Sequence, residues 1–153
     1  MKRTSFEKDS NSEYAELFLS VRDFIKICIG NDVKEKYSEN ITTFYSKEGG
    51  FCYIKVKDDY VHIGWFRGRH ITDKYNFLFG KGKTIRGQRI YKLDKLARDS
   101  IKYYVNETLI FLFEYNELRD LKNNLWKVSK IKYYKYWHNK QVCTILIVSK
   151  NKY

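Results

Sequence analysis

The stretch 41–70, ITTFYSKEGGFCYIKVKDDYVHIGWFRGRH, decides the fold of this chain. Successive side chains of a strand point to opposite faces, and residues 51–56 and 60–66 both alternate in a way that gives each an apolar face. Residues 41–45 are rich in β-branched and aromatic side chains, which favour strands. Polar and glycine-rich turns separate these three runs. The stretch therefore predicts a three-stranded antiparallel meander.

A helix is predicted before the meander. Ser10 and Glu13 match a capping box, and apolar residues then recur at intervals of three and four up to Gly30. We expect residues 1–12 to be frayed, because they are polar and precede the cap. Residues 32–37, with Asp32 as a cap, are predicted to form a short helical turn.

A fourth strand and a long helix are predicted after the meander. Residues 84–91 alternate, and Asp94 is suited to cap a helix that runs to about Leu121. The fold class is therefore α+β, with a single antiparallel sheet of the three meander strands plus at least one more, covered by the N-terminal and C-terminal helices. The stripe expected to be buried on the second helix is Ala97, Ile101, Tyr104, Val105, Thr108, Leu112 and Phe113.

The C-terminal segment is predicted to be separate from this domain. We place a domain at 10–121 and a basic extension at 122–153. Within the extension, residues 127–137 alternate loosely and residues 142–148 form a β-branched run, with polar residues between them. This pattern predicts a β-hairpin, which would have to join a sheet edge or pack elsewhere to avoid an exposed strand.

The net charge of +12 is concentrated in two segments. Residues 61–98 hold ten basic and two acidic residues, and residues 124–153 hold seven basic and no acidic ones. Such asymmetry is typical of a polyanion-binding surface. It is also what a composition rich in Lys, Asn, Ile, Tyr and Phe gives without any role in binding. The ligand or protein partner is not specified by these features.

The cysteines and the apolar segments bear on location. Cys28, Cys52 and Cys143 are an odd, widely spaced set among apolar neighbours, which is typical of reduced thiols in a cytosolic protein. The N-terminal residues do not resemble a signal peptide, and no run approaches the ~20 apolar residues of a membrane span. We expect a cytoplasmic protein that does not enter the membrane.

Several short runs in and around the meander form a recognisable pattern. They are Glu35-Lys36-Tyr37, Phe44-Tyr45, Lys47, Phe51-Cys52-Tyr53, Val61-His62-Ile63-Gly64-Trp65-Phe66-Arg67-Gly68, Gly80-Lys81-Gly82-Lys83, Arg86, Ile90 and the helix capped by Asp94. This pattern resembles the YdhG-like family, a group of domains of unknown function. The resemblance covers about residues 10–121 and departs from the family pattern at Thr42, where a proline is common, and at Gly87, where a histidine often follows the arginine.

The resemblance implies a small cytoplasmic α+β domain with helices on one side of an antiparallel sheet. Some members of the family are described as frataxin-like intracellular iron chaperones. Iron would need carboxylate ligands, and Asp32, Glu35 and Glu39 are the candidates if they share a helical face. Each of them is more simply explained as a solvated surface group.

An anion or nucleic-acid site is the second hypothesis. Aromatic and cationic residues are interleaved near one end of the predicted sheet, which suits base stacking and phosphate neutralisation. Trp65 shares a face with Val61 and Ile63, however, and this position also predicts a buried side chain. The candidate residues are Trp65, Arg67, Arg69, Lys81, Lys83, Arg86 and Arg89.

The glycine-rich run 80–84, GKGKT, lacks the first glycine of a P-loop, because Phe77 stands in its place. Its amides and lysines could instead form an anion-binding nest or a plain solvated turn. No serine or cysteine has an assignable base partner in the sequence. We therefore expect a non-enzymatic binding or chaperone-like module with catalytic residues absent.

Overall fold

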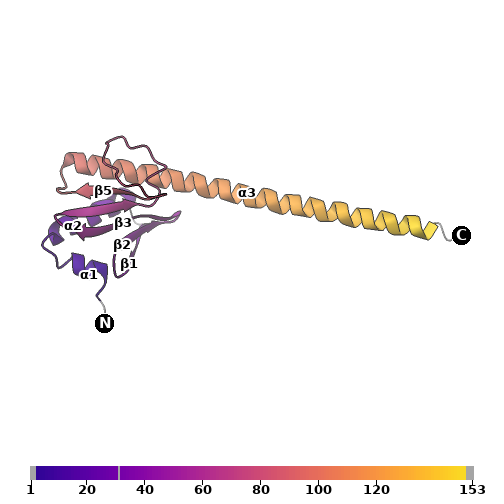
Figure 1. Cartoon of the computed structure of the whole chain (residues 1–153), viewed down its shortest axis with the longest axis horizontal. Coiled ribbons are helices and arrows are strands. Elements are labelled where there is room, and N and C mark those ends of the chain that lie inside the picture. Colours follow the sequence, from indigo (N-terminus) through magenta and orange to yellow (C-terminus); the bar gives the residue numbers. More distant parts are fainter. Residues whose placement is uncertain (1–2, 31, 151–153) are drawn as a thin grey trace. The chain divides into compact units, whose positions relative to one another are not determined.

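A computed structural model describes residues 3–30 and 32–150, with side chains described as far as Lys127. The chain divides into two compact units, Met1–Glu114 and Tyr115–Tyr153. Figure 1 labels the elements along the chain. They are α1 (Ser5–Asp9), α2 (Ala15–Ile29), β1 (Lys34–Tyr37), β2 (Thr42–Ser46), β3 (Gly49–Lys57), β4 (Tyr60–Trp65), β5 (Arg86–Ile90) and α3 (Lys95–Lys150).

The five strands form one antiparallel sheet in the order β1-β2-β3-β4-β5. The predicted meander is confirmed as β2, β3 and β4, with Ile54 opposite Ile63 in the central pair. Asp58 has a positive φ of 51° and allows a tight turn between β3 and β4 without a glycine. The predicted fourth strand is confirmed as β5, which pairs with β4. The α+β fold class is therefore correct.

The first strand was not expected. Residues 34–37 were predicted to lie in a helical turn, but they form β1, which pairs with β2 from Lys34 opposite Tyr45 to Tyr37 opposite Thr42. Pairing with β1 gives hydrogen-bond partners to the backbone N–H and C=O groups on the edge of β2. The stabilisation from these hydrogen bonds cannot be inferred from the local sequence pattern that predicted a helical turn. Glu35 of β1 also receives hydrogen bonds from Arg22 of α2, at 2.8 and 2.9 Å.

The N-terminal prediction was wrong in its details. Residues 5–9 form the short helix α1, in which Thr4 and Glu7 make the capping box, and Ser10 lies at the end of that helix. The helix α2 starts at Ala15 without a side-chain cap and ends at Gly30, as predicted, where φ is 84°. The predicted capping box of Ser10 and Glu13 does not form; the box of Thr4 and Glu7 forms instead, on a short helix whose Phe6 packs against the core.

All three helices of the first unit lie on one face of the sheet. Trp65 of β4 packs against Tyr104 of α3, with ring centroids 5.8 Å apart, and Ser5 of α1 contacts Thr42 of β2. The predicted stripe on α3 is buried except for Phe113, which is exposed. The residues that fill the core between sheet and helices include Phe18, Val21, Ile25, Phe44, Ile54, Ile63, Trp65, Ile101, Tyr104 and Val105.

A buried polar chain joins the sheet to α3. The indole N–H of Trp65 donates to Gln88 Oε1 at 3.2 Å, and Gln88 Nε2 donates to Ser100 Oγ at 2.8 Å. The Ser100 hydroxyl donates in turn to the Ala97 carbonyl at 2.8 Å. Each buried polar group in the chain thus has a partner, which fixes the position of β5 against the helix.

The predicted C-terminal hairpin does not form. Asp94 caps α3 as expected, by accepting from the Ala97 amide at 2.8 Å, but the helix continues to Lys150. The chain has no proline, and no glycine follows Gly87, so nothing in this region breaks a helix. The first unit ends at Glu114, within α3 and before the predicted boundary at Leu121.

Two further expectations can be compared with the structure. Cys52 is buried, Cys28 is partly buried, and both are free thiols; the side chain of Cys143 lies outside the described residues. Burial raises the pKa of both described thiols. Within the described residues, no helix is both long and apolar enough to cross a bilayer.

Candidate functional site

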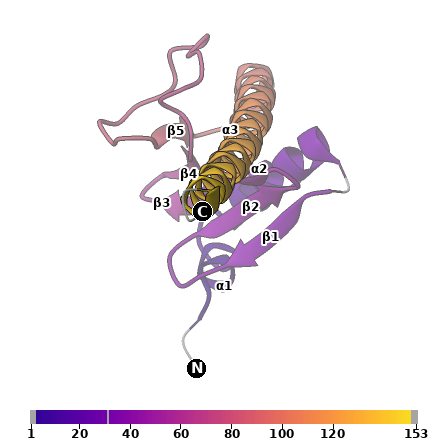
Figure 2. The same cartoon turned by 90° about the vertical axis from the view of Figure 1, so that its right-hand side faces the viewer.

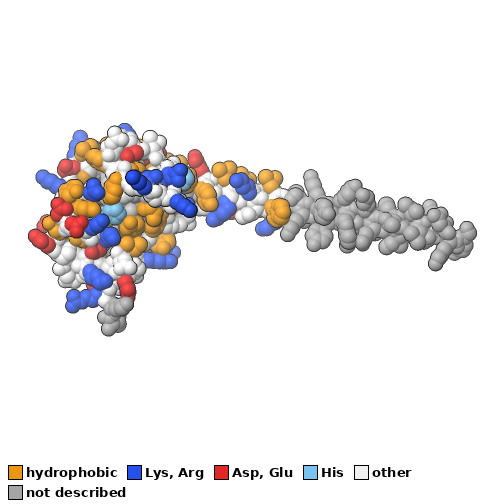
Figure 3. All heavy atoms as spheres, in the orientation of Figure 1, with side chains coloured by type: hydrophobic (Ala, Val, Ile, Leu, Met, Phe, Trp, Pro, Cys, Tyr) orange, Lys and Arg blue, Asp and Glu red, His pale blue; other side chains and the backbone are white. Residues whose placement is uncertain are grey.

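The sheet face opposite the helices carries the candidate site, and we call it the outer face. The strand register places two rows of residues across it. One row is Tyr53, Gly64 and Gly87, and the other is Lys55, His62 and Arg89. Figure 3 shows hydrophobic and basic side chains interleaved on the folded unit. Apolar rings and cations thus alternate on the side of the sheet that the helices leave uncovered.

Two glycines let aromatic rings lie directly on the sheet. A Cβ atom at Gly64 would lie 2.1 Å from Tyr53 Cε1, and one at Gly87 would lie 2.5 Å from His62 Cε1 and 2.7 Å from Phe79 Cζ. Any larger residue at either position would displace these rings. The glycines are therefore needed for the shape of the outer face, in addition to any role in the backbone.

Phe79 reaches the outer face from the loop between β4 and β5. Its amide donates to the Gly87 carbonyl at 2.9 Å, and the Gly87 amide donates back at 2.8 Å, so one isolated pair extends the sheet beyond β5. The rest of this loop stands out from the sheet in Figure 2. Backbone pairing thus holds the Phe79 ring in place although it belongs to a loop.

His62 is held as a neutral ring at the centre of the site. Its Nε2 lies 3.2 Å from the Tyr53 hydroxyl, and its buried Nδ1 has no hydrogen-bond partner among the described residues. Burial, and to a smaller extent the nearby cations Lys55, Lys57 and Arg89, lower the pKa of His62 to about 4. At neutral pH the positive charge of the outer face therefore comes from lysine and arginine.

Arg89 covers the edge of the aromatic cluster. Its guanidinium carbon lies 4.2 Å from the ring centroid of Phe79 and 5.7 Å from that of Tyr60, the geometry of cation–π contacts. The side chain is exposed, and within the described residues no carboxylate forms an ion pair with it. The guanidinium is thus held in place by rings while its charge stays available to an anion.

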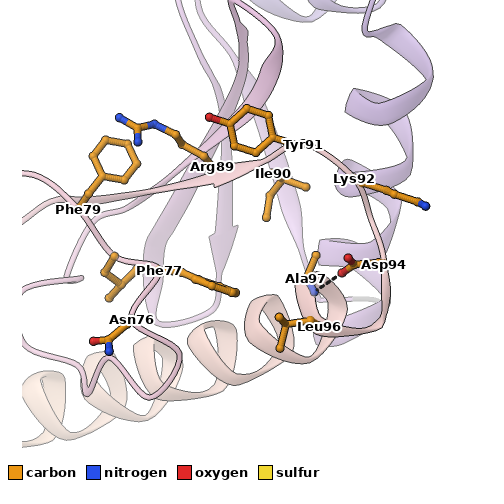
Figure 4. Close-up of a pocket in the computed structure, with 11 residues that line it drawn as sticks. Asn76, Phe77, Phe79, Arg89, Ile90, Tyr91, Lys92, Asp94, Leu96 and Ala97 are labelled. Carbon is orange, nitrogen blue, oxygen red and sulfur yellow. Dashed lines mark hydrogen bonds between the residues drawn. The ribbon is translucent and has the colours of Figure 1, made fainter.

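A hollow of about 460 Å³ adjoins the outer face and shares Phe79 and Arg89 with it. Figure 4 shows Phe77, Tyr91 and Leu96 around it. All three are exposed apolar side chains, and Lys92 adds a second cation to the lining. The volume falls within the range of small-ligand sites, and the lining is mostly apolar, with the cations Arg89 and Lys92 and the carboxylate of Asp94 among its polar residues.

The predicted anion-binding residues are only partly brought together. Trp65 is fully buried against Tyr104, so the prediction that it stacks on bases was wrong; its neighbours in the β4 register pointed to the core. Arg89 lies on the outer face as described above. Lys81 and Lys83 are exposed on the loop between Phe79 and β5.

The remaining predicted arginines are engaged with the backbone or partly buried. Arg86 Nη1 donates to the carbonyls of Gly82 and Ile85, at 2.6 and 2.8 Å. Arg69 Nη1 donates to the Lys83 carbonyl at 3.4 Å, and Arg67 is half-buried. Carbonyl oxygens of this loop therefore face a guanidinium, which is the opposite of the amide nest suggested for an anion.

The predicted metal ligands do not share a helical face. Glu35 lies on β1, where it pairs with Arg22 and with Lys26 Nζ at 2.8 Å, and these contacts lower its pKa although burial opposes them. Asp32 and Glu39 lie outside β1, before and after it. Within the described residues, no group of three His, Cys, Asp or Glu side chains could hold a metal ion.

The central residues of the outer face, Tyr53, His62 and Phe79, were not among the predicted site residues. The alternation of β3 and β4 was visible in the sequence, and it placed Tyr53 and His62 away from the core. The position of Phe79 opposite Gly87 depends on a contact between a loop and a strand edge. The sequence carried no signal for that contact.

Comparison with known proteins adds no relative from which a function could be transferred. No family model, curated protein or solved structure matches this chain. The functional interpretation therefore depends on the geometry of the outer face and on the physical chemistry of its residues.

Proposed function

We propose that the protein is a non-enzymatic binding module that takes single-stranded nucleic acid on the outer face of its sheet. One observation carries the proposal: aromatic rings pack against Gly64 and Gly87 on the face of the sheet that the helices leave uncovered. Three cations, Lys55, Lys57 and Arg89, lie near the neutral His62 on the same face. Proteins that bind single strands combine a cationic surface with rings on which bases stack. Both components are present on the outer face.

The aromatic part would supply stacking. The Phe79 ring lies beside His62, with centroids 5.6 Å apart, and Tyr53 lies 5.7 Å from His62 in the same way. These rings are partly exposed, so a base can approach them. The adjoining hollow is mostly apolar and would suit an unstacked base, with its phosphate near Arg89 or Lys92 and away from the carboxylate of Asp94.

The cationic part would supply phosphate contacts. Lys81 and Lys83 lie on the loop that connects Phe79 to β5, so their charges are close in sequence to the edge of the outer face. Contacts with phosphates release counterions, and binding therefore weakens as salt rises. This part of the proposal retains the predicted role of the segment 65–89 but moves its centre from Trp65 to Phe79 and Arg89.

The family resemblance remains a separate prediction. A YdhG-like cytoplasmic domain would be compatible with a binding role of this kind. Iron delivery is supported by the resemblance alone, since the candidate carboxylates Asp32, Glu35 and Glu39 do not form a ligand cluster with one another in the described residues. We therefore favour the nucleic-acid proposal over the iron-chaperone one.

The proposal can be tested by fluorescence anisotropy of the full chain with a labelled oligouridine of about 12 nucleotides. Each phosphate contact contributes about −0.7 to the slope of log K against log salt for a single strand. We expect the variant K55A/K57A to reduce that slope by about 1.4. The variant F79A should weaken binding by roughly 5- to 150-fold, because stacking on one ring contributes about 1–3 kcal/mol.

The matched control is K95A/K102A, which removes two exposed lysines from α3 on the other side of the sheet. It should leave both the affinity and the slope close to those of the wild type. Equal losses in the two double variants would show that only net charge matters. Undetectable binding at low salt would refute the proposal, and equal affinity for a duplex would refute the stacking component.

A further inference from the structure

The hollow beside the outer face has a wall that is already in place. Asp73 accepts hydrogen bonds from the amides of Phe77 at 3.1 Å and Leu78 at 3.0 Å. The Tyr104 hydroxyl of α3 donates to the same carboxylate, which anchors this part of the loop to the helix. The Phe77 ring also stacks on Tyr75, with centroids 6.1 Å apart. A planar ligand would therefore meet a ring that does not have to be ordered on binding.

The two cations of the lining point outward from the hollow. Figure 4 shows the Arg89 side chain turned toward Phe79 and the Lys92 side chain extending away from the other residues drawn. Asn76 and Tyr91 add neutral polar groups to the lining. The two positive charges disfavour a cationic ligand, and they attract an anionic group such as a phosphate. The hollow therefore suits a ligand that combines a planar apolar part with a negative charge.

Asp94 adds a hydrogen-bond acceptor to the hollow. Among the described residues that line it, Asp94 carries the one carboxylate. Its Oδ1 accepts from the Ala97 amide at 2.8 Å, as the dashed line in Figure 4 marks, and this contact holds the side chain in place. Within the described part of the chain, Oδ2 accepts no hydrogen bond. It is therefore available to donors on a ligand in the hollow.

We propose that the hollow selects guanine, and that Asp94 is the residue that selects it; the inference rests on the proposed function, because the base belongs to the strand on the outer face. A carboxylate only accepts hydrogen bonds. Guanine presents two adjacent donors, N1–H and the N2 amino group, on its Watson–Crick edge. Adenine, cytosine and uracil each place an acceptor directly beside the donor on that edge, and a carboxylate oxygen repels it. Guanine is therefore the base whose edge matches Asp94, while its ring stacks on Phe77.

Fluorescence anisotropy with the full chain tests the inference. It compares labelled oligouridine of about 12 nucleotides with the same strand carrying one central guanosine. We expect the guanosine strand to bind roughly 5- to 150-fold more tightly, the range for one bidentate contact with a base edge. A central adenosine controls for the stronger stacking of a purine and should give much less of this gain. Inosine, which lacks the N2 amino group of guanosine, should lose most of it.

The variant D94N tests the role of the carboxylate. If the amide oxygen of the new side chain keeps the contact with the Ala97 amide, its NH₂ group takes the place of Oδ2 and faces the donors of guanine. The preference for guanosine over adenosine should therefore disappear, while binding of oligouridine is retained. Asparagine caps helices about as well as aspartate, so α3 should still begin at the same place, which circular dichroism can check.

The matched control is D99N, which removes the same charge from an exposed position of α3 that does not line the hollow. It should leave the preference for guanosine unchanged. Equal affinity for the guanosine and adenosine strands would overturn the inference and leave the proposed function standing, and so would a guanosine preference that D94N does not reduce. Undetectable binding of every strand at low salt would overturn both.

Discussion

Replacing Gly87 by alanine tests the outer face without removing any of its functional groups. The new Cβ would lie 2.5 Å from His62 Cε1 and 2.7 Å from Phe79 Cζ. Carbon atoms pack best at about 3.5–4.0 Å, so both rings would have to move by about 1 Å. The backbone of Gly87 has no positive φ, and alanine is therefore allowed there.

The expected change in stability is the balance of two effects. Alanine in a strand is favoured over glycine by about 0.5–1 kcal/mol. Overpacking of a close contact costs about 1–3 kcal/mol. We therefore expect G87A to lower the free energy of unfolding by about 1 kcal/mol. If stacking on Phe79 is what binds bases, its displacement should weaken oligonucleotide binding by roughly 5- to 150-fold.

Urea denaturation followed by circular dichroism gives the stability, and anisotropy gives the affinity. The control is G82A in the neighbouring loop, where the nearest atom to a new Cβ is the Ile85 carbonyl oxygen at 3.4 Å. It should leave the affinity unchanged and should not lower the free energy of unfolding, which a Gly-to-Ala change at a compatible backbone position raises by about 0.4–1 kcal/mol. If NMR shows that the Phe79 ring has moved in G87A while the affinity stays at the wild-type value, the stacking argument is refuted.

Three further outcomes follow from buried polar groups. Q88L should lower the free energy of unfolding by about 1–3 kcal/mol in urea denaturation, because the buried indole N–H of Trp65 loses its acceptor; a neutral effect would contradict the role of the Trp65–Gln88–Ser100 chain. T108V should raise it by about 1 kcal/mol, since the buried Thr108 hydroxyl makes no hydrogen bond in the described structure, and an unchanged melting temperature would count against this. The free energy of unfolding should fall as pH drops from about 6.5 to about 4, because His62 is protonated at a higher pH in the unfolded chain than in the folded one. Urea denaturation at several pH values measures this dependence, and the variant H62Q should reduce it.

The central part of the fold could be predicted because its signals are local. Alternation over 51–56 and 60–66 and the polar turn between them specify β3, β4 and their pairing, and the spacing of apolar residues specifies α2 and the buried side of α3. Gly30 and Asp94 mark helix ends through their own backbone and side-chain chemistry. These features need no knowledge of distant residues.

The candidate site was located poorly for the same reason. Trp65 was named for its chemistry, but the core pairs it with Tyr104 and Gln88, a contact between residues far apart in the chain. Phe79 was passed over because nothing near it in sequence shows that it lies on Gly87. A site formed by cross-strand and loop contacts can be recognised only when those contacts are known.

The sequence by itself determined the α+β class, the meander and the two amphipathic helices, because periodicity and turn chemistry act over a few residues. Tertiary structure alone decided three things: that 34–37 joins the sheet as an edge strand, that residues 5–9 form a separate short helix capped by Thr4, and that aromatic rings pack against Gly64 and Gly87 on the outer face. Each of these depends on free energy gained between segments that are distant in sequence, and no local pattern reports that gain.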